Sequence, residues 1–174
     1  MKNQVPEVTL RPIQAEDAET LMELNNNTAV SDFVVGNPQK VTLEQQLRWM
    51  ENLSNEKNTV RFMVEFEGVA VGTVIISSID RTNATGNMNI KLLPEYQGRG
   101  IARIALDKAC QFAFDDLNIV CLTAHILSYN ERSCALFKRV GFRIDGILRS
   151  RVIKNGARHD LIALSLLAQE RNSQ

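Results

Sequence analysis

The chain has 174 residues, 44% of them hydrophobic, and its 20 Lys and Arg residues balance its 20 Asp and Glu residues. A chain of this length usually forms one domain and can bury a core without disulfides or metal ions. Because the net charge is zero, no overall field attracts nucleic acid or an anionic membrane, and neither partner is expected. No apolar run approaches the roughly 20 residues of a membrane span, and the polar start lacks a signal core, so we expect a cytoplasmic protein.

The three cysteines, Cys110, Cys121 and Cys134, lie in segments with apolar patterning. Their number is odd and their spacing does not match a metal site. A free cysteine packs as a small hydrophobic residue. We therefore expect reduced core cysteines and no bound metal.

The first part of the chain predicts a short strand and two helices. Residues 8–13 form the strand, and residues 15–24 form a helix with acidic residues in its first turn. Residues 30–40 are expected to be irregular, because a glycine and a proline interrupt any period. Thr42 then begins a second helix, with Gln45 completing a capping box.

The middle of the chain alternates between apolar and polar residues. Residues 60–66, 69–79 and 87–93 each read as a strand, and the short links between them predict an antiparallel meander. A long amphipathic helix follows at residues 98–115.

The last part predicts a strand, a helix and a hairpin. Residues 119–126 form the strand and residues 130–139 the helix. Residues 142–153 and 157–167 form two strands joined by Asn155–Gly156, a strong hairpin signal. The last six residues are polar and are expected to fray.

The segment between residues 87–93 and the long helix carries the chemistry. Pro94 ends the strand, and Gly98 and Gly100 allow the main chain to approach a ligand closely. Main-chain N–H groups at the start of a helix suit a phosphate or pyrophosphate, and Arg99 adds charge. The alternative is a glycine-rich turn that only starts a helix. A P-loop lysine is absent, and Arg103 stands where the dinucleotide fingerprint needs a small residue.

Two motifs resemble those of the Gcn5-related N-acetyltransferase (GNAT) family. The first is Gln97-x-x-Gly100-x-Ala102, which is similar to the pyrophosphate loop of that family. The second is Asn130-x-x-Ser133-x-x-Leu136-Phe137-x-x-x-Gly141-Phe142. The similarity extends over residues 8–167, which implies that residues 1–174 form a single domain with its core at 8–167.

A finer resemblance is to the ribosomal-protein N-terminal acetyltransferases and the spermidine acetyltransferases. Residues 24–27, residues 94–98 and the hairpin at Asn155–Gly156 carry it. The family resemblance implies an α+β fold with a mostly antiparallel sheet of about seven strands. It also implies a V-shaped splay between the fourth and fifth strands and four flanking helices.

The resemblance implies acetyl-coenzyme A (acetyl-CoA) as co-substrate. Main-chain groups near Leu92 and Leu93 would hold its pantetheine arm, an N–H near Leu92 would polarise the thioester carbonyl, and amides of residues 98–102 would hold the pyrophosphate. Asn130 would contact the pantetheine, although its position also fits a helix N-cap. The implied cofactor residues are Leu92, Leu93, Gln97, Gly98, Arg99, Gly100, Ile101, Ala102 and Asn130.

The acid that protonates the leaving thiolate differs from the family pattern. A tyrosine normally serves, but the matching residue here is Phe137. Ser133, one helical turn earlier, is the preferred substitute, because the ribosomal-protein subgroup has a serine there. Tyr129 and water remain alternatives.

The base that accepts the amine proton is also changed. Spermidine acetyltransferases have a glutamate where this chain has Asn87. Asp160 is the leading candidate and Asp80 the second, and His125 and His159 are further groups that could carry a proton.

The predicted function is transfer of an acetyl group from acetyl-CoA to a primary amine. Candidate acceptors are a protein N-terminus, a polyamine, an amino sugar and an amino acid. One alternative, which Phe137 and Asn87 favour, is a non-catalytic CoA-binding module that acts through a protein partner. Another is a nucleotide-phosphate binder without acetyl transfer. Pairing of edge strands into a homodimer is also possible.

Overall fold

The computed structural model describes residues 7–171, which fold around one seven-stranded sheet. The strand order is β1-β2-β3-β4-β5-β7-β6, and every neighbouring pair is antiparallel except β4 and β5. The expected mostly antiparallel α+β sheet is confirmed. The strands are β1 (Val8–Pro12), β2 (Val60–Phe66), β3 (Val69–Asp80), β4 (Thr85–Leu92), β5 (Cys121–Leu127), β6 (Arg143–Lys154) and β7 (Ala157–Leu167).

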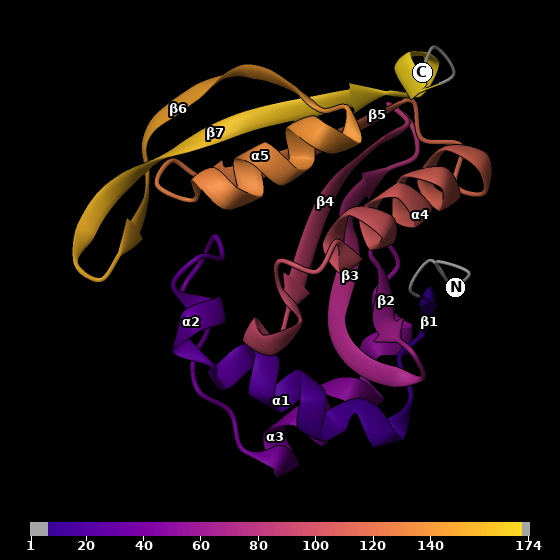
Figure 1. Cartoon of the computed structure of the whole chain (residues 1–174), viewed down its shortest axis with the longest axis vertical. Coiled ribbons are helices and arrows are strands. Elements are labelled where there is room, and N and C mark those ends of the chain that lie inside the picture. Colours follow the sequence, from indigo (N-terminus) through magenta and orange to yellow (C-terminus); the bar gives the residue numbers. More distant parts are fainter. Residues whose placement is uncertain (1–6, 172–174) are drawn as a thin grey trace, which may run out of the picture.

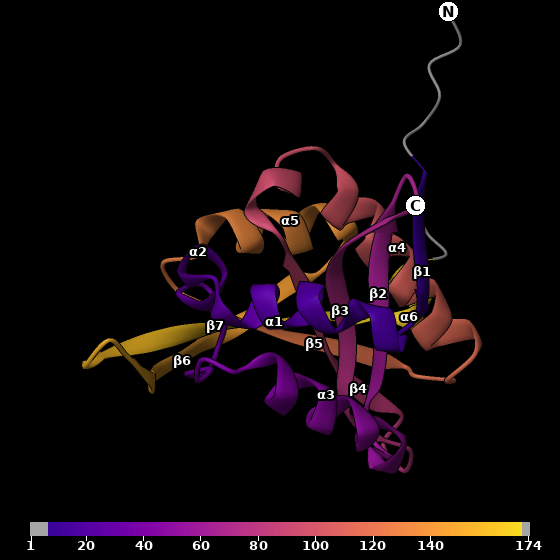
Figure 2. The same ribbon diagram turned by 90° about the horizontal axis from the view of Figure 1, so that it is seen from below.

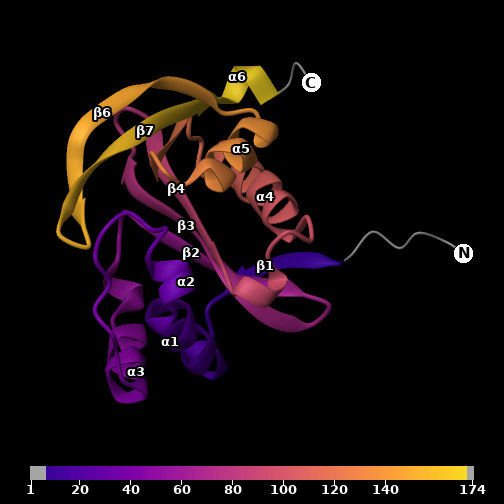
Figure 3. The ribbon, with the colours of Figure 1, turned by 60° about the vertical axis from the view of Figure 1, so that its left-hand side comes forward.

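Helices cover both faces of the sheet, as Figure 3 shows: α1, α2 and α3 lie on one side, and α4 and α5 lie on the other. Among the described residues four helices have nine residues or more, as expected, and the rest are single turns. The helices are α1 (Ala18–Asn26), α2 (Thr28–Ser31), α3 (Leu43–Glu51), α4 (Ile101–Asp115), α5 (Glu131–Val140) and α6 (Ala168–Arg171), with 3₁₀ turns at Ala15–Asp17, Leu53–Asn55 and Pro94–Tyr96.

The sequence-based expectations need two local corrections. Residues 28–31 form α2, which overlaps the start of the segment expected to be irregular. The side chain of Asn27 caps this turn by accepting a hydrogen bond from Ala29 N. The tail is helical over Ala168–Arg171, where the Glu170 carboxylate accepts from Leu167 N. Residues 172–174 of the tail lie outside the described residues.

The β6–β7 hairpin reaches across to the first helices. Its turn has positive φ at both Asn155 (50°) and Gly156 (78°), which is the geometry of a type I′ turn. Figure 2 shows the hairpin extending beyond the rest of the sheet, beside α2. Lys154 at its end is buried, and its Nζ donates to Ser31 O over 2.7 Å and to Gly36 O. The hairpin therefore fixes the segment that follows α1.

The main core lies between α4, α5 and the sheet. The apolar stripe of α4 is fully buried, with Ile101, Ala105, Leu106, Ala109 and Ala113 at 0% exposure. Cys110 also lies in this core, and burial raises the pKa of its thiol to about 12. Cys121 and Cys134 are free but only partly buried, so the core assignment is confirmed for Cys110 alone.

A buried ionic network fixes the start of the chain. The guanidinium of Arg11 makes two hydrogen bonds of 2.8 Å with the carboxylate of Asp17 and one of 2.6 Å with Glu65. Asp17 is 2% exposed and also accepts from Gln14 N over 2.7 Å. The network ties β1 and β2 to the turn that leads into α1.

Candidate active site

The two central strands separate along their length, as Figure 1 shows. Residues 85–87 of β4 pair with residues 121–123 of β5, and no further pairs join the two strands. Beyond that point β4 still pairs with β3 up to Leu92, while β5 pairs with β7 up to Leu127. The expected splay between the fourth and fifth strands is confirmed.

The main-chain groups of Leu92 point into this splay. Leu93 N donates to Val71 O over 2.9 Å. The next pair, Leu92 with Gly72, is therefore a non-hydrogen-bonded pair, in which both residues direct their main-chain groups away from each other. By the same alternation Ile90 also faces away from β3. The side of β4 that has lost its partner strand thus carries the N–H groups of Ile90 and Leu92.

Gln97 and Leu93 complete this end of β4 in different ways. The side-chain amide of Gln97 donates to Leu92 O over 2.9 Å, and its oxygen accepts from Arg132 Nη1 over 3.0 Å. The N–H of Leu93 donates to Val71 O, and its carbonyl accepts from Tyr96 N. Of the two leucines predicted to hold the pantetheine arm, only Leu92 has a main-chain N–H directed into the splay.

The loop before α4 presents a row of unpaired N–H groups. Gly98 and Gly100 have φ of 75° and 82°, in the left-handed region that favours glycine. Gly100 is the N-cap of α4 and has no side chain to cap it. In the described part of the chain, no hydrogen bond satisfies the N–H groups of residues 98–103. Ile101 and Ala102 contribute two of these groups from the first turn of α4.

The rest of the loop is open and positively charged. A Cβ on Gly100 would meet no atom within 4 Å, so space remains in front of the main chain. The Arg99 guanidinium lies over the rings of Phe66 and Tyr96, 5.3 and 5.8 Å from their centroids. Open space, unpaired donors and a helix N-terminus suit the pyrophosphate of coenzyme A.

Tyr129 and Asn130 both contact the segment after α2. The Tyr129 hydroxyl donates to Asp32 O over 2.6 Å, and Asn130 Nδ2 donates to Phe33 O over 3.1 Å. Asn130 Oδ1 also accepts from Ser133 N, which makes Asn130 the N-cap of α5. The structure thus confirms the N-cap role of Asn130, and its contact with the pantetheine stays a prediction.

Ser133 and Phe137 lie on the same side of α5 but in different surroundings. Phe137 is 3% exposed, and its ring contacts Phe142 with centroids 5.0 Å apart. Ser133 is partly buried, and its hydroxyl makes no hydrogen bond within residues 7–171. The Ser133 hydroxyl is therefore free to donate a proton.

The two predicted carboxylate bases have structural contacts. Asp160 Oδ1 accepts from Ser150 N over 2.7 Å, at an irregular part of β6. Asp80 accepts from the N–H groups of Thr82 and Asn83 and from the side chain of Asn83. These hydrogen bonds from Asn83 lead the causes that lower the pKa of Asp80. Both carboxylates stabilise turns or bulges of the main chain.

A polar cluster at the vertex of the splay was not predicted as a unit. His125 Nδ1 lies 3.1 Å from Asn87 Oδ1, and Thr123 Oγ1 lies 3.3 Å from the same oxygen. Asn87 and Thr123 form the last β4–β5 pair, and His125 comes two residues later. From the sequence alone His125 is only one of two candidate proton carriers, because the spacing of residues does not show which strands become neighbours.

Lys91 is a second residue that the sequence analysis did not single out. It lies on the same face of β4 as Asn87 and Asn89, because side chains alternate along a strand. Burial lowers the pKa of its ammonium group, and the nearby cations Arg61 and Lys154 lower it further. The sequence does contain a signal for this residue, because Lys91 ends an alternating row of polar residues just before the glycine loop.

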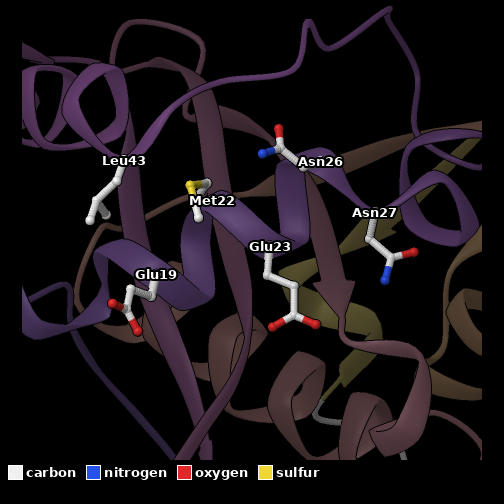
Figure 4. A pocket seen from close by; sticks show the side chains of 6 residues that line it. All are labelled: Glu19, Met22, Glu23, Asn26, Asn27 and Leu43. Carbon is white, nitrogen blue, oxygen red and sulfur yellow. The ribbon is translucent and has the colours of Figure 1, made fainter.

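A shallow groove of about 520 Å³ lies elsewhere, along α1 (Figure 4). It is lined by Glu19, Met22, Glu23, Asn26, Asn27 and Leu43. The buried residues of α1 are Ala18, Leu21 and Leu24, so the groove follows the opposite side of this helix. It contains none of the predicted site residues, and the splay is the better candidate for chemistry.

Comparison with known proteins identifies the family. The family model described as an acetyltransferase (GNAT) domain matches residues 7–143. The chain belongs to the GNAT acetyltransferase family. It is 26% identical over 163 residues to the spermidine N(1)-acetyltransferase of Escherichia coli K12, a match that covers 94% of this chain and 87% of that one. It is also 26% identical to the Bacillus subtilis protein YdaF, provisionally named a ribosomal N-acetyltransferase, over 94% and 92% of the two chains.

The GNAT fold is also seen in solved structures. Spermidine N-acetyltransferase from Vibrio cholerae, crystallised with CoA and spermine, superposes with a TM-score of 0.89 at 23% identity, over 95% of this chain and 98% of that one. Within residues 7–171 no helix is both long and apolar enough to cross a membrane. The same residues contain no cluster of three or more His, Cys, Asp or Glu side chains placed to hold a metal ion.

Proposed function

We propose that this GNAT protein transfers the acetyl group of acetyl-CoA to the nitrogen of an amine. The observation that carries the proposal is the N–H of Leu92 directed into the splay, followed along the chain by the unpaired N–H groups of residues 98–103. An extended arm with an acyl group at one end and a pyrophosphate at the other matches this arrangement. When bound, acetyl-CoA supplies an activated acetyl group as a thioester.

The chain holds this co-substrate mainly by its main chain. Leu92 and Ile90 offer N–H groups along the arm and to the thioester carbonyl oxygen, where a fixed donor stabilises the developing negative charge. The N–H groups of Gly98 to Arg103 take the pyrophosphate, and Arg99 adds a positive charge. Gln97 holds the turn in place through its bond to Leu92 O.

His125 is the proposed base for the acceptor amine. An alkyl ammonium group has a pKa near 10.4, so it must lose a proton before it can attack. An amide oxygen can only accept, so the proton in the contact with Asn87 belongs to His125 Nδ1. His125 Nε2 then has a free lone pair for the amine proton. Asp160 is less suitable, because its carboxylate already accepts from Ser150 N.

Ser133 is the proposed acid for the leaving thiolate. Its hydroxyl is free, whereas the Tyr129 hydroxyl already donates to Asp32 O. Burial raises the pKa of Tyr129, and Asp32 raises it further, but the choice of Ser133 depends on its free hydroxyl and not on relative acidity. Ser133 Oγ passes its proton to the sulfur as it accepts one from a water molecule, so no alkoxide forms.

The acceptor, the location and the oligomeric state are further parts of the proposal. The acceptor is an amine-bearing small molecule or peptide, and the proposed location is the cytoplasm. A homodimer stays a prediction: β6 is one of the two edge strands of the sheet, and its residues Ile144 and Ile147 are 50% and 62% exposed.

A thiol-release assay with the purified full chain, acetyl-CoA and a panel of amines tests the proposal. We expect stoichiometric release of CoA thiol and acetyl-amine with at least one primary amine. If the protein binds CoA tightly but acetylates no amine of any class, the non-catalytic CoA-binding module becomes the better account. If ATP displaces CoA at equal concentration, the site is instead a general nucleotide-phosphate site.

A further inference from the structure

Lys91 lies on the face of β4 opposite the core, and in the proposed reaction the acceptor approaches from this face. Met88 and Leu92 pack into the core formed with α4 and α5, so the alternate residues Asn87, Asn89 and Lys91 face the other side. On that side α1 contacts β3, and the β6–β7 hairpin brings Lys154 into electrostatic range. The same strand directs the main chain of Ile90 and Leu92 into the splay. Lys91 therefore borders the place where amine and thioester meet.

The ammonium group of Lys91 has no counter-charge. Among the described residues it makes no hydrogen bond or ion pair, and the charged groups that act on it are the cations Arg61 and Lys154. Arg61 is neutralised by Glu56, with contacts of 2.8 and 3.1 Å. The Lys154 ammonium is held by the carbonyls of Ser31 and Gly36. Lys91 alone of the three has no acceptor.

A partly buried ammonium without an acceptor is unfavourable, and a negatively charged ligand removes that penalty. A polyamine would bring further positive charge beside the ammonium groups of Lys91 and Lys154, and like charges in a site of low dielectric constant repel. The other polar side chains of β4 on this face, Asn87 and Asn89, are neutral, and within residues 7–171 no carboxylate is among the charged groups that act on Lys91. The electrostatics of the face thus oppose a polyamine and favour an anion.

We infer that the acceptor is an amine that also carries an anionic group, a carboxylate or a phosphate, and that Lys91 pairs with this group. The inference rests on the proposed acetyl transfer and names the class of its acceptor. The relatives whose names state spermidine as acceptor would then differ from this chain in substrate class.

Matched amine pairs test the inference. One pair is an α-amino acid and its amide, another is aminoethyl phosphate and aminoethanol, and spermidine is the polycation. We expect kcat/KM to be at least about tenfold higher for the anionic member of one pair than for its neutral partner, and lowest for spermidine. The pair that shows the preference distinguishes a carboxylate from a phosphate.

Variants assign the preference to Lys91. Lys91→Met should remove it, Lys91→Glu should reverse it in favour of spermidine, and Lys108→Met, an exposed lysine on α4, should leave it unchanged. CoA affinity and thermal melting show that each variant is folded. A wild-type preference for spermidine, or a pair ratio unaltered in Lys91→Met, would overturn the inference while leaving acetyl transfer intact. Failure of the proposed function would appear differently, as no turnover with any amine.

Discussion

His125 Nδ1 and Asn87 Oδ1 lie 3.1 Å apart, across the vertex at which β4 and β5 separate. In this chain an asparagine stands where spermidine acetyltransferases are expected to have a glutamate base. Through this hydrogen bond Asn87 orients the imidazole of His125 on the neighbouring strand. In the proposed mechanism the base is therefore His125, on the neighbouring strand.

His125→Gln should lower kcat by roughly a hundredfold, because a positioned general base contributes about that much. The KM for acetyl-CoA should stay unchanged, because the cofactor loop is untouched. Steady-state kinetics with saturating acetyl-CoA measure both. Added imidazole should partly restore the rate of His125→Ala, which a purely structural role would not allow. His159→Gln is the matched control and should retain wild-type activity.

Ser133→Ala should slow turnover by roughly tenfold or more if this hydroxyl protonates the thiolate. Tyr129→Phe is the comparison variant. We expect a smaller decrease in its turnover rate, because the Tyr129 hydroxyl already donates a hydrogen bond to Asp32 O. Single-turnover thiol release separates chemistry from product release. A full loss in Tyr129→Phe with normal Ser133→Ala would assign the acid to the tyrosine.

Gly100→Glu should abolish acetyl-CoA binding, since it places a carboxylate where the pyrophosphate is expected. Gly100→Ala is the control, because φ of 82° strains any side chain there at a cost of roughly 1 kcal/mol without adding charge. Calorimetric titration with CoA should show weak binding or none for the glutamate variant and only a modest loss for the alanine variant. Equal affinities in the two variants would contradict a repulsion between charges.

Asp17→Ala should lower the free energy of unfolding by about 3 kcal/mol, because Arg11 would lose its bidentate partner in a nearly buried site. Burial alone would raise the pKa of Asp17, but hydrogen bonds from Arg11 and from Gln14 N outweigh it, so the pKa is lowered from 3.8. A carboxyl whose pKa is lower in the folded state stabilises the fold above its unfolded pKa.

The pH dependence follows from that sign. The stability difference between wild type and Asp17→Asn should be full at neutral pH and shrink as pH falls below about 4. Urea unfolding from pH 7 to pH 3 measures it. A difference that grows on acidification would mean that the ionised carboxylate does not stabilise the fold.

Most of the fold was readable from local patterns. Alternation in residues 60–66 and 157–167 gave strands with the bounds that the structure shows, and the Asn155–Gly156 turn has the two positive φ values that its sequence favours. The sequence pattern does not predict the helix at residues 28–31, because this helix has only four residues and depends on a single side-chain cap. Short elements of this kind have little sequence signal.

The site was predictable where it depends on the main chain and less so where it depends on contacts between distant strands. Gly98 and Gly100 reveal the loop directly, since glycine adopts positive φ at the lowest cost. The pairing of Asn87 with His125 depends on which strands become neighbours and on where they diverge. Lys91 differs from the nearby cations because Arg61 pairs with Glu56 and Lys154 donates to main-chain carbonyls, whereas Lys91 has no acceptor among the described residues. None of these relationships appears in the spacing of residues along the chain.

Amide chemical shifts on titration with CoA test the central claim most directly. If the co-substrate occupies the splay, the ¹H–¹⁵N signals of Leu92 and of residues 98–103 should move most, and saturably, as hydrogen bonds form at those N–H groups. If those signals stay in place while CoA binds, or move no more than signals along α1, the proposed mode of binding is wrong.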